Sequence, residues 1–448
     1  MLKAVLLIGG PQKGTRFRPL SLDTPKPLFP VAGMPLIQHH IETCVKMEDC
    51  KEIIIIGSYT TEQMAKFMEE VKNEYRHIDI RYLQEFTPLG TGGALYHFRD
   101  QIRAGNPTAF FMMNGDVCAD IEFNELFKFH QSKEPEALIT IMGTQATKQQ
   151  SVHYGCLVSD VKTDAVTHYV EKPDSYVSTL INCGVYVCSL HVFNLMAKAF
   201  ENKQKNYYRG NGTGTSHPSY MSWELDVLAP LAGTDRLFVM QVSTTGSFVF
   251  RFFYHDAETF YIYMFLQVTS WWSQMKTAGS AIYANRHFLE LYKRDKPQKL
   301  TRNAANRCTI IDDVFVSPSA TIAPTAVIGP NVTVGAGVTI KDGVRVKESI
   351  ILENATIEEH ALVMYSVVGK NATVGEWARV EGTPADPDPN KQMAKVDNTP
   401  LFNVDGRLNP SITILGACVN VPAETILLNS IVLPHKHLSR SIKHEIIL

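Results

Sequence analysis

The sequence lacks an excess of basic residues and closely spaced cysteines, two features that mark particular classes of protein. Its 43 Lys and Arg residues are balanced by 45 Asp and Glu residues, for a formal net charge of -2. It therefore lacks the basic excess that gathers nucleic acid or anionic membrane. The eight cysteines are scattered and form no Cys-x-x-Cys pair, which argues against zinc motifs and a disulfide framework. We expect no nucleic-acid partner, and reduced thiols in a cytoplasmic protein.

Long, clean apolar runs are also missing. The run at Met1–Ile8 ends at a Gly-Gly pair and is too short for the hydrophobic core of a signal peptide. The segment Gly246–Val268 has nine aromatic residues among 23, but charged residues interrupt it, so it does not suit a bilayer span. We expect no membrane partner, and we interpret residues 243–268 as an aromatic insertion without an assigned function.

Residues 1 to about 240 alternate short apolar runs with amphipathic stretches. This pattern is typical of an α/β, Rossmann-like domain with a parallel sheet covered on both faces. Ligands of such sheets bind at the carboxyl ends of the strands, where Gly9, Glu85 and Asp116 fall. The expected strands are Ala4–Ile8, Glu52–Ile56, Ile80–Leu83, Ala109–Met113 and Leu237–Val242, and the expected helical stretches are Leu36–Met47, Thr61–Tyr75, Gly92–Ile102 and Phe123–His130.

From about residue 310 apolar residues recur every six positions, which predicts a parallel β-helix because each turn can bury its face only against the next. The pattern resumes near Val368 and again near Leu415. Between them Thr383–Pro410, rich in Pro, Asp and Asn, predicts a long loop ejected from the β-helix. We expect two domains, 1–300 and 301–448, with the ejected loop at 383–410. The recurring apolar residues are Ile322, Ile328, Val334, Ile340, Val346 and Leu352.

The first expected strand runs into a turn at Gly9 and Gly10, followed by Arg16, Arg18 and Lys26. Glycines after a buried strand let backbone N–H groups approach phosphates, and the basic residues supply positive charge. The alternative is an ordinary loop with solvated basic residues. Gly-Thr-Arg, Arg-Pro-Leu and Pro-Lys-Pro, following the glycine pair in that order, favour phosphate binding.

Several separated motifs, taken in order, resemble the sugar-phosphate nucleotidyltransferases, and the hexapeptide repeats are similar to those of their GDP-mannose pyrophosphorylase branch. The resemblance implies that the β-helix is left-handed. The motifs are Gly9-Gly10, Gly14-Thr15-Arg16, Pro25-Lys26-Pro27, Leu89–Gly93, Asn114–Asp116, Val170–Pro173 and Ile181–Gly184. The resemblance further implies ligand contacts at Leu6, Gly9, Gly10, Glu85, Gly90, Asp116, Glu171, Lys172, Asn182 and Gln274, with the sugar phosphate on Glu171, Lys172 and Asn182.

Members of that family join a sugar 1-phosphate to a nucleoside triphosphate, with Mg²⁺ on carboxylates and substrate phosphates. Asp116 is placed to be one metal ligand. The second carboxylate of active members lies in a Trp-x-Asp-x-Gly stretch, and here Gln274 stands in its place, with Lys276 nearby. The phosphate loop also differs from that of active members. Between Gly9-Gly10 and Gly14-Thr15-Arg16 this chain has the three residues Pro11–Lys13, where active members have one. Even a small displacement of the groups that position a substrate lowers the reaction rate steeply.

Both departures resemble the regulatory, alpha type of subunit in this family. That resemblance implies an inactive subunit in which Arg16, Lys26 and Asp116 are vestigial, and which needs no cofactor, with Mg²⁺ only if it is active. It implies that GDP-mannose binds near Glu85 and Gln274 and that the chain mediates feedback inhibition of a catalytic beta subunit. Homo- and hetero-oligomers are expected, with the loop at 383–410 reaching the partner.

Three alternatives remain at this point. The chain could be an active mannose-1-phosphate guanylyltransferase that pairs Asp116 with Asp256 or Asp226. It could use the β-helix as an acyltransferase, for which His360 is the only histidine in the clear repeats. It could be a scaffold similar to subunits of a translation-initiation exchange factor, but the Glu-Lys-Pro and Asn-x-Gly motifs argue against a site-free scaffold.

Overall fold

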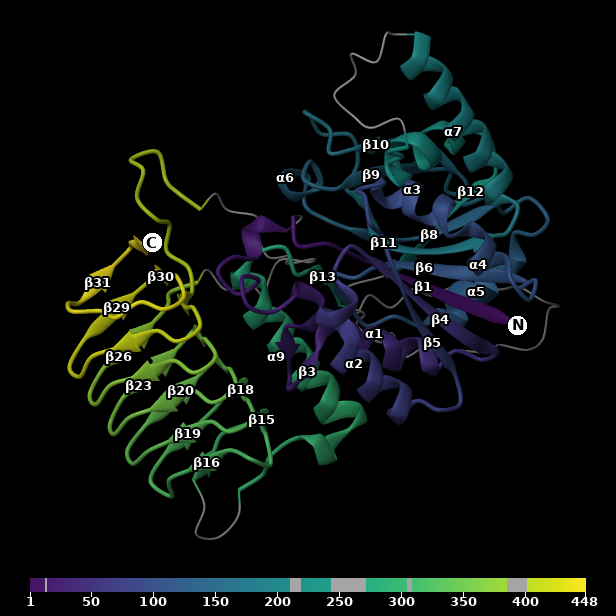
Figure 1. Ribbon diagram of the computed structural model, residues 1–448. Helices are drawn as coiled ribbons and strands as arrows, with labels where there is room; N and C mark the ends of the chain where they lie inside the picture. The colour runs from purple at the N-terminus through teal and green to yellow at the C-terminus, as the bar shows by residue number, and fades with distance from the viewer. Residues whose placement is uncertain (13, 210–218, 243–270, 304–307, 385–400) are drawn as a thin grey trace, which may run out of the picture.

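The computed structural model describes residues 1–12, 14–209, 219–242, 271–303, 308–384 and 401–448. An α/β domain and a β-helix lie side by side, with helix α9 (Ala278–Asp295) between them (Figure 1). The predicted fold class, an α/β domain followed by a parallel β-helix, is confirmed. The aromatic insertion at about 243–268 lies outside the described residues.

The α/β domain is built on a nine-stranded sheet with the main order β10-β9-β11-β6-β1-β4-β5, beside which β8 and β12 pair. Strands β1, β4, β5 and β6 are parallel, as the alternating pattern predicts. Beyond them the sheet is mixed, because β11 runs antiparallel to β6 and β8. The strands are β1 (Leu2–Gly9), β4 (Cys50–Gly57), β5 (Asp79–Gln84), β6 (Ala109–Asn114), β8 (Ile139–Gln145), β9 (Gly155–Ser159), β10 (Val166–Glu171), β11 (Leu180–Ser189) and β12 (Leu237–Val242).

The central strand β1 is apolar at nearly every position because both faces of the sheet are covered. Leu6 packs into the core on one face, and its neighbours Val5 and Leu7 pack into the core on the other. Helices α1, α2 and α5 contribute to the first core, and α3, α4 and α7 to the second. The helices are α1 (Leu36–Val45), α2 (Thr61–Glu74), α3 (Gly90–His97), α4 (Arg99–Arg103), α5 (Phe123–Ser132), α6 (Lys148–Ser151), α7 (Val192–Arg209) and α8 (Ala229–Leu231).

In the described part of this domain there are also two small sheets and four short helical turns. The ribbon of β7 and β13 borders the cavity described below. The strands are β2 (Pro30–Val31), β3 (Met34–Pro35), β7 (Val117–Ala119) and β13 (Trp272–Gln274), and the turns are η1 (Thr15–Phe17), η2 (Lys26–Leu28), η3 (Glu224–Leu228) and η4 (Pro297–Lys299).

The β-helix consists of three parallel sheets stacked coil upon coil. The first contains β14 (Thr309–Ile310), β17 (Val327–Ile328), β20 (Arg345–Lys347), β23 (Leu362–Met364), β26 (Arg379–Glu381), β29 (Ile426–Leu428) and β31 (Ile442–Lys443). The second contains β15 (Val314–Val316), β18 (Val332–Val334), β21 (Ile350–Ile351), β24 (Ser366–Val368), β27 (Thr413–Leu415), β30 (Ile431–Val432) and β32 (Ile446–Ile447). The third contains β16 (Thr321–Ile322), β19 (Thr339–Ile340), β22 (Thr356–Ile357), β25 (Thr373–Val374) and β28 (Asn420–Val421).

The six-residue period holds through Val346 and then slips by one residue. Val334 pairs with Ile351, and Ile351 lies in the β-helix core. The prediction that Leu352 continues the inward-facing series is therefore wrong. Leu352 instead packs in the core that α9 shares with the outside of the β-helix.

The expected interruption of the β-helix is visible in its register. Ile350 pairs with Val367, but Val367 pairs with Ile414, across a much longer stretch of chain. Residues 385–400 lie outside the described residues. Residues 401–409 form a turn closed by a bridge between Phe402 and Leu408, and it projects from the end of the β-helix (Figure 1).

Helix α9 joins the two parts through the fully buried Asn285. Its Oδ1 accepts hydrogen bonds from the Ala32 backbone N–H, at 2.9 Å, and from the Thr333 hydroxyl, at 2.6 Å. Its Nδ2 donates to the Asn331 carbonyl at 3.3 Å. One side chain thus binds the α/β domain and the β-helix together. No helix in the described residues is both long enough and apolar enough to cross a membrane.

Candidate functional site

A cavity of about 400 Å³ opens at the carboxyl ends of β1 and β6. The end of β1 at Gly9 and the residues after β6 at Asp116 form one side, and Glu171 and Asn182 from β10 and β11 form the other. This is the edge at which parallel sheets of this kind bind ligands. The predicted residues that line the cavity are Gly9, Gly10, Arg16, Lys26, Asp116, Glu171, Lys172, Asn182 and Gln274.

Leu6, Glu85 and Gly90 are not among the residues that line this cavity. Leu6 is buried within β1. The Glu85 carboxylate accepts the Leu89 backbone N–H at 2.6 Å and the Ser58 hydroxyl at 3.3 Å, so it orders the loop before α3. Ligand contacts at these three residues stay predictions.

Close packing explains the glycine at position 90. Gly90 has φ +78°, and a Cβ there would lie 2.5 Å from the Met221 carbonyl oxygen. Any other residue would be strained and would push this segment away. The glycine thus lets the loop approach the chain just before η3.

The glycine pair makes a sharp turn after β1. Gly9 has φ +64°, and a Cβ on Gly10 would lie 2.8 Å from the Ser58 Cβ. Gly14, at φ +80°, then precedes η1. Glycine is thus favoured at Gly9 and Gly14 by the positive φ and at Gly10 by the close approach of Ser58, and together they let the backbone turn at the cavity. Lys13 lies outside the described residues.

Lys26 and Asp116 form an ion pair inside the cavity. Lys26 Nζ donates to Asp116 Oδ2 at 3.1 Å, and its side chain is 13% exposed. Lys26 comes from η2 and Asp116 from the turn between β6 and β7. The carboxylate that the sequence nominates as a metal ligand therefore already has a cationic partner.

Gln274 lies beside Asp116 because β13 pairs antiparallel with β7. Gln274 is the register partner of Val117, and the Met275 backbone N–H donates to the Asp116 carbonyl at 2.8 Å. The Gln274 Oε1 atom is buried and has no hydrogen-bond partner among the described residues. Two residues on, Lys276 also lines the cavity, and burial lowers its pKa to about 8.

The residues present do not fit a resident Mg²⁺ ion. Mg²⁺ requires oxygen ligands, usually one or two carboxylates with substrate phosphates. Asp116 is bound by Lys26, Gln274 is neutral, and Lys276 adds a positive charge nearby. In the described part of the chain, no group of three His, Cys, Asp or Glu side chains could hold a metal ion.

The opposite side of the cavity carries a hydrogen-bonded network. Asn182 Nδ2 donates to the hydroxyls of Tyr186, at 2.8 Å, and Tyr169, at 3.2 Å, and its Oδ1 accepts the Gly184 N–H at 2.9 Å. The Tyr169 hydroxyl donates to Glu171 Oε2 at 2.8 Å. These bonds fix the orientation of the Asn182 amide at the cavity wall.

The sequence did not predict that the two tyrosines belong to this network. Tyr169 lies two positions before Glu171 on β10, so both point to one face of the strand. That alternation was the signal that could have found Tyr169. Tyr186 lies four positions after Asn182 on β11, but Gly184, at φ +74°, interrupts the regular strand between them. The alternation of side chains therefore does not predict that Tyr186 and Asn182 share a face.

The carboxylate suggested as a second metal ligand lies elsewhere. Asp226 Oδ2 accepts the Ser222 backbone N–H at 2.7 Å and pairs with Lys203, and Asp226 does not line the cavity. The pairing of Asp116 with Asp226 is therefore wrong, because the π-helical turn η3 directs Asp226 toward α7. Asp256 lies outside the described residues. His360 stacks on Trp377, at 4.3 Å between ring centroids, on the β-helix.

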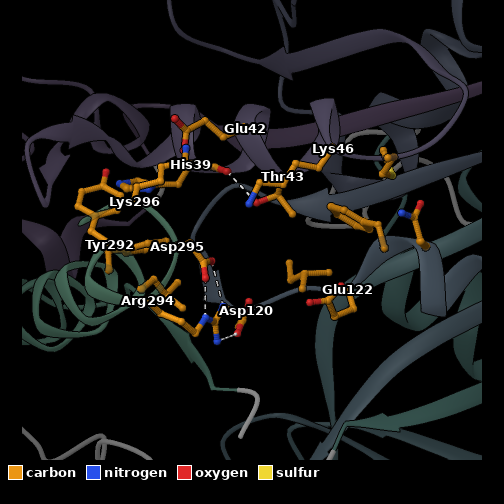
Figure 2. Close-up of a pocket in the computed structure, with 17 residues that line it drawn as sticks. His39, Glu42, Thr43, Lys46, Asp120, Glu122, Tyr292, Arg294, Asp295 and Lys296 are labelled. Carbon is orange, nitrogen blue, oxygen red and sulfur yellow. Dashed lines mark hydrogen bonds and ion pairs between the residues drawn. The ribbon is translucent and has the colours of Figure 1, made fainter. Parts of the chain in front are cut away.

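A second, smaller cavity of about 130 Å³ lies between α1, α9 and the segment after β7. Figure 2 shows charged side chains around it, with Arg294 bonded to both Asp120 and Asp295. Burial alone would raise the pKa of Glu42, but the hydrogen bond from Lys296 and nearby positive charge lower it below its ordinary value. Ion pairs thus neutralise most of the charged side chains around this smaller cavity.

The fold and the larger cavity together define a nucleotidyl transferase domain joined to a β-helix. Residues 3–215 match the family model for nucleotidyl transferase, and residues 310–448 match the GMPPB C-terminal domain. This confirms the class that the ordered motifs indicate.

Comparison with curated proteins identifies the branch. The chain is 60% identical to the mannose-1-phosphate guanylyltransferase regulatory subunit alpha of Drosophila melanogaster, with 100% of both chains covered. It is 48% identical to the regulatory subunit alpha-B of Danio rerio and 48% identical to the regulatory subunit alpha of Rattus norvegicus, again over 100% of both chains. The chain belongs to the family of mannose-1-phosphate guanylyltransferase regulatory alpha subunits.

Proposed function

We propose that this protein is a regulatory, non-catalytic subunit that binds GDP-mannose in the larger cavity and mediates feedback inhibition of a catalytic beta subunit. The names of its relatives support the regulatory assignment. A regulatory subunit acts by making the assembly prefer one state when its ligand is bound. In this proposal the protein works in a hetero-oligomer with that catalytic subunit.

The proposal rests mainly on one observation: the groups that would bind a sugar phosphate are in place on one side of the cavity, whereas the groups that would bind a metal ion on the other side are not. On the sugar side, Asn182 and Glu171 are held in a complete hydrogen-bonded network. On the other side, Lys26 binds Asp116, and the neutral Gln274 stands where the resemblance to active family members implies a carboxylate. Such a cavity retains groups for binding a nucleotide sugar but lacks the arrangement for transferring a nucleotidyl group.

The cytosol is the proposed location. All eight cysteines are free thiols, which suits a reducing compartment.

The relatives' names further support a catalytic partner chain, since a regulatory subunit must act on another subunit.

The test combines binding and turnover on one sample of the full-length chain. Isothermal titration calorimetry with GDP-mannose is followed by an assay of pyrophosphate release from GTP and mannose 1-phosphate with Mg²⁺. We expect saturable binding and no pyrophosphate release above background. The same preparation, added to the purified catalytic beta subunit, should make turnover by that subunit more sensitive to GDP-mannose.

Two results would contradict the proposal. Turnover at ordinary enzymatic rates by the chain alone would show a catalytic subunit. No binding of GDP-mannose, together with no effect on the beta subunit, would remove the regulatory role. Asn182→Ala is the matched negative control, because it removes the amide that the tyrosine network orients.

A further inference from the structure

Lys276 is fixed beside Asp116 by the backbone. It lies two residues after the end of β13, and its N–H donates to the Gln274 carbonyl at 2.9 Å. The Met275 N–H bonds the Asp116 carbonyl, and the next residue, Thr277, caps α9. The side chain leaves this constrained segment and lines the cavity.

The ammonium group is supported by an aromatic ring. Lys276 Nζ lies 4.3 Å from the centroid of the Tyr154 ring. Tyr154 is itself buried and packs edge-on against Trp272, at 5.5 Å between centroids. A cation over a ring face is held by the quadrupole of the ring, so the lysine has a preferred position before any ligand arrives.

The other charges of the cavity are largely paired. Lys26 bonds Asp116, and Lys172 bonds Glu171 at 3.0 Å. Glu224, the remaining carboxylate of the cavity lining, accepts bonds from the Ser222 and Thr91 hydroxyls. The lining cations Arg16 and Lys276 form no ion pair with a carboxylate of the described residues.

Of these two cations, Arg16 is exposed and Lys276 is half-buried. Water therefore screens the Arg16 charge much more than the Lys276 charge. A half-buried ammonium without a carboxylate is costly, and burial lowers the pKa of Lys276. An anionic ligand that reached Nζ would relieve this cost and gain a charge-assisted hydrogen bond.

We propose that Lys276, in place of a divalent cation, neutralises the diphosphate of the nucleotide sugar bound in this cavity. This inference rests on the proposed function above, and it adds how the site binds a diphosphate although its residues do not fit Mg²⁺. A lysine ammonium is a compact point charge well suited to phosphate oxygens. The turn at Gly9 and Gly10 brings backbone to the same cavity.

The experiment is calorimetric binding of GDP-mannose to the full-length chain, once with excess EDTA and once with Mg²⁺. For the unsubstituted chain we expect affinities that agree within about twofold. Lys276→Met should weaken binding about 10- to 100-fold, as expected for loss of a hydrogen bond to a charged group, and GDP should show the same loss. Lys276→Arg keeps the charge and should recover most of the affinity.

The matched control is Lys347→Met on the β-helix. Lys347 also lies over a tyrosine, with Nζ 5.9 Å from the Tyr365 ring centroid, so the same substitution tests the general effect of losing such a lysine. It should bind GDP-mannose as the unsubstituted chain does. Melting temperatures of all variants separate a binding defect from a folding defect.

The outcomes separate this inference from the proposed function. Binding that requires Mg²⁺, or Lys276→Met binding as tightly as the unsubstituted chain, overturns the role of Lys276 and leaves the regulatory function standing. Equal losses in Lys276→Met and Lys276→Arg with lowered melting temperatures also overturn it, since they indicate a structural role. No binding of GDP-mannose to the unsubstituted chain contradicts the proposed function, and this inference with it.

Discussion

Lys26 donates a hydrogen bond to Asp116 within the larger cavity, with 3.1 Å between Nζ and Oδ2. The two residues are far apart in the sequence and come from η2 and from the turn between β6 and β7. The ion pair neutralises the charge of the carboxylate locally. It also occupies an oxygen that a metal ion would need, which decides how the site responds to substitution.

Restoring the missing carboxylate alone should not restore catalysis. Gln274→Asp places an acid beside Asp116, but Lys26 still binds Asp116 and Pro11–Lys13 still lengthens the phosphate loop. We expect no release of pyrophosphate from GTP and mannose 1-phosphate with Mg²⁺. Gln274→Asn is the control for changing the side chain without adding charge. Turnover by Gln274→Asp but not by Gln274→Asn would contradict this prediction.

Loss of one tyrosine hydroxyl should weaken ligand binding. Tyr186→Phe removes the closer acceptor of the Asn182 amide, at 2.8 Å, and leaves Tyr169 as its other partner. A net hydrogen bond contributes about 1 kcal/mol, so GDP-mannose affinity should fall by roughly threefold to tenfold by calorimetry. Tyr365→Phe on the β-helix is the matched control. Equal affinities for both variants would show that the network does not orient Asn182 for the ligand.

The contact between the two parts of the molecule should contribute to stability. Asn285→Ala leaves the Ala32 N–H and the Asn331 carbonyl without their side-chain partner in a buried place. Such loss costs about 1 to 3 kcal/mol in the free energy of unfolding. Urea denaturation followed by circular dichroism measures it. The exposed Asn194→Ala, on α7, should change stability by less than about 0.5 kcal/mol, and equal effects would refute the assignment.

Stability should fall as the pH is lowered from 6.5 to 4. Burial lowers the pKa of both His39 and His40 from 6.5 to about 4, so in this range the unfolded chain binds protons that the folded chain does not. Each histidine can cost on the order of 3 kcal/mol by the end of that window. The free energy of unfolding, measured at several pH values, should therefore decrease with acid.

Substitution separates this effect from general acid denaturation. His40→Gln removes one of the buried histidines whose pKa burial lowers, a group that among the described residues also includes His39, His130 and His287. Its free energy of unfolding should therefore depend less steeply on pH between 6.5 and 4. His168→Gln, at an exposed position on β10, is the control for changing a histidine. If His40→Gln keeps the full slope of the unsubstituted chain, the buried histidine is not the source.

The local patterns of the chain predict much of the fold. The apolar alternation places β1, α1 and the parallel strands correctly, and the six-residue period predicts the β-helix through Val346. The slip at Ile351 and the antiparallel entry of β11 were not predictable, because runs buried on both faces look alike in either direction. These features depend on contacts with distant parts of the chain.

The candidate site, like the fold, could be predicted from the sequence only in part. Residues within ordered motifs, such as Gly9, Lys172 and Asn182, do line one cavity. The pairing of Lys26 with Asp116 and the position of Lys276 over Tyr154 required the structure, since each joins segments that the sequence keeps far apart. Asp226 is not a metal ligand at the cavity because its carboxylate binds Lys203 and the Ser222 backbone N–H, contacts that the sequence pattern does not reveal.

The buried contacts of Asn285 have a mechanical consequence. The β-helix cannot move away from the α/β domain without breaking bonds of Asn285, either the one to Ala32 or those to Thr333 and Asn331. Ala32 lies just beyond η2, which carries Lys26 into the cavity. One buried side chain therefore holds the joint from both sides, and its partner in the α/β domain lies six residues after Lys26 in the same short segment.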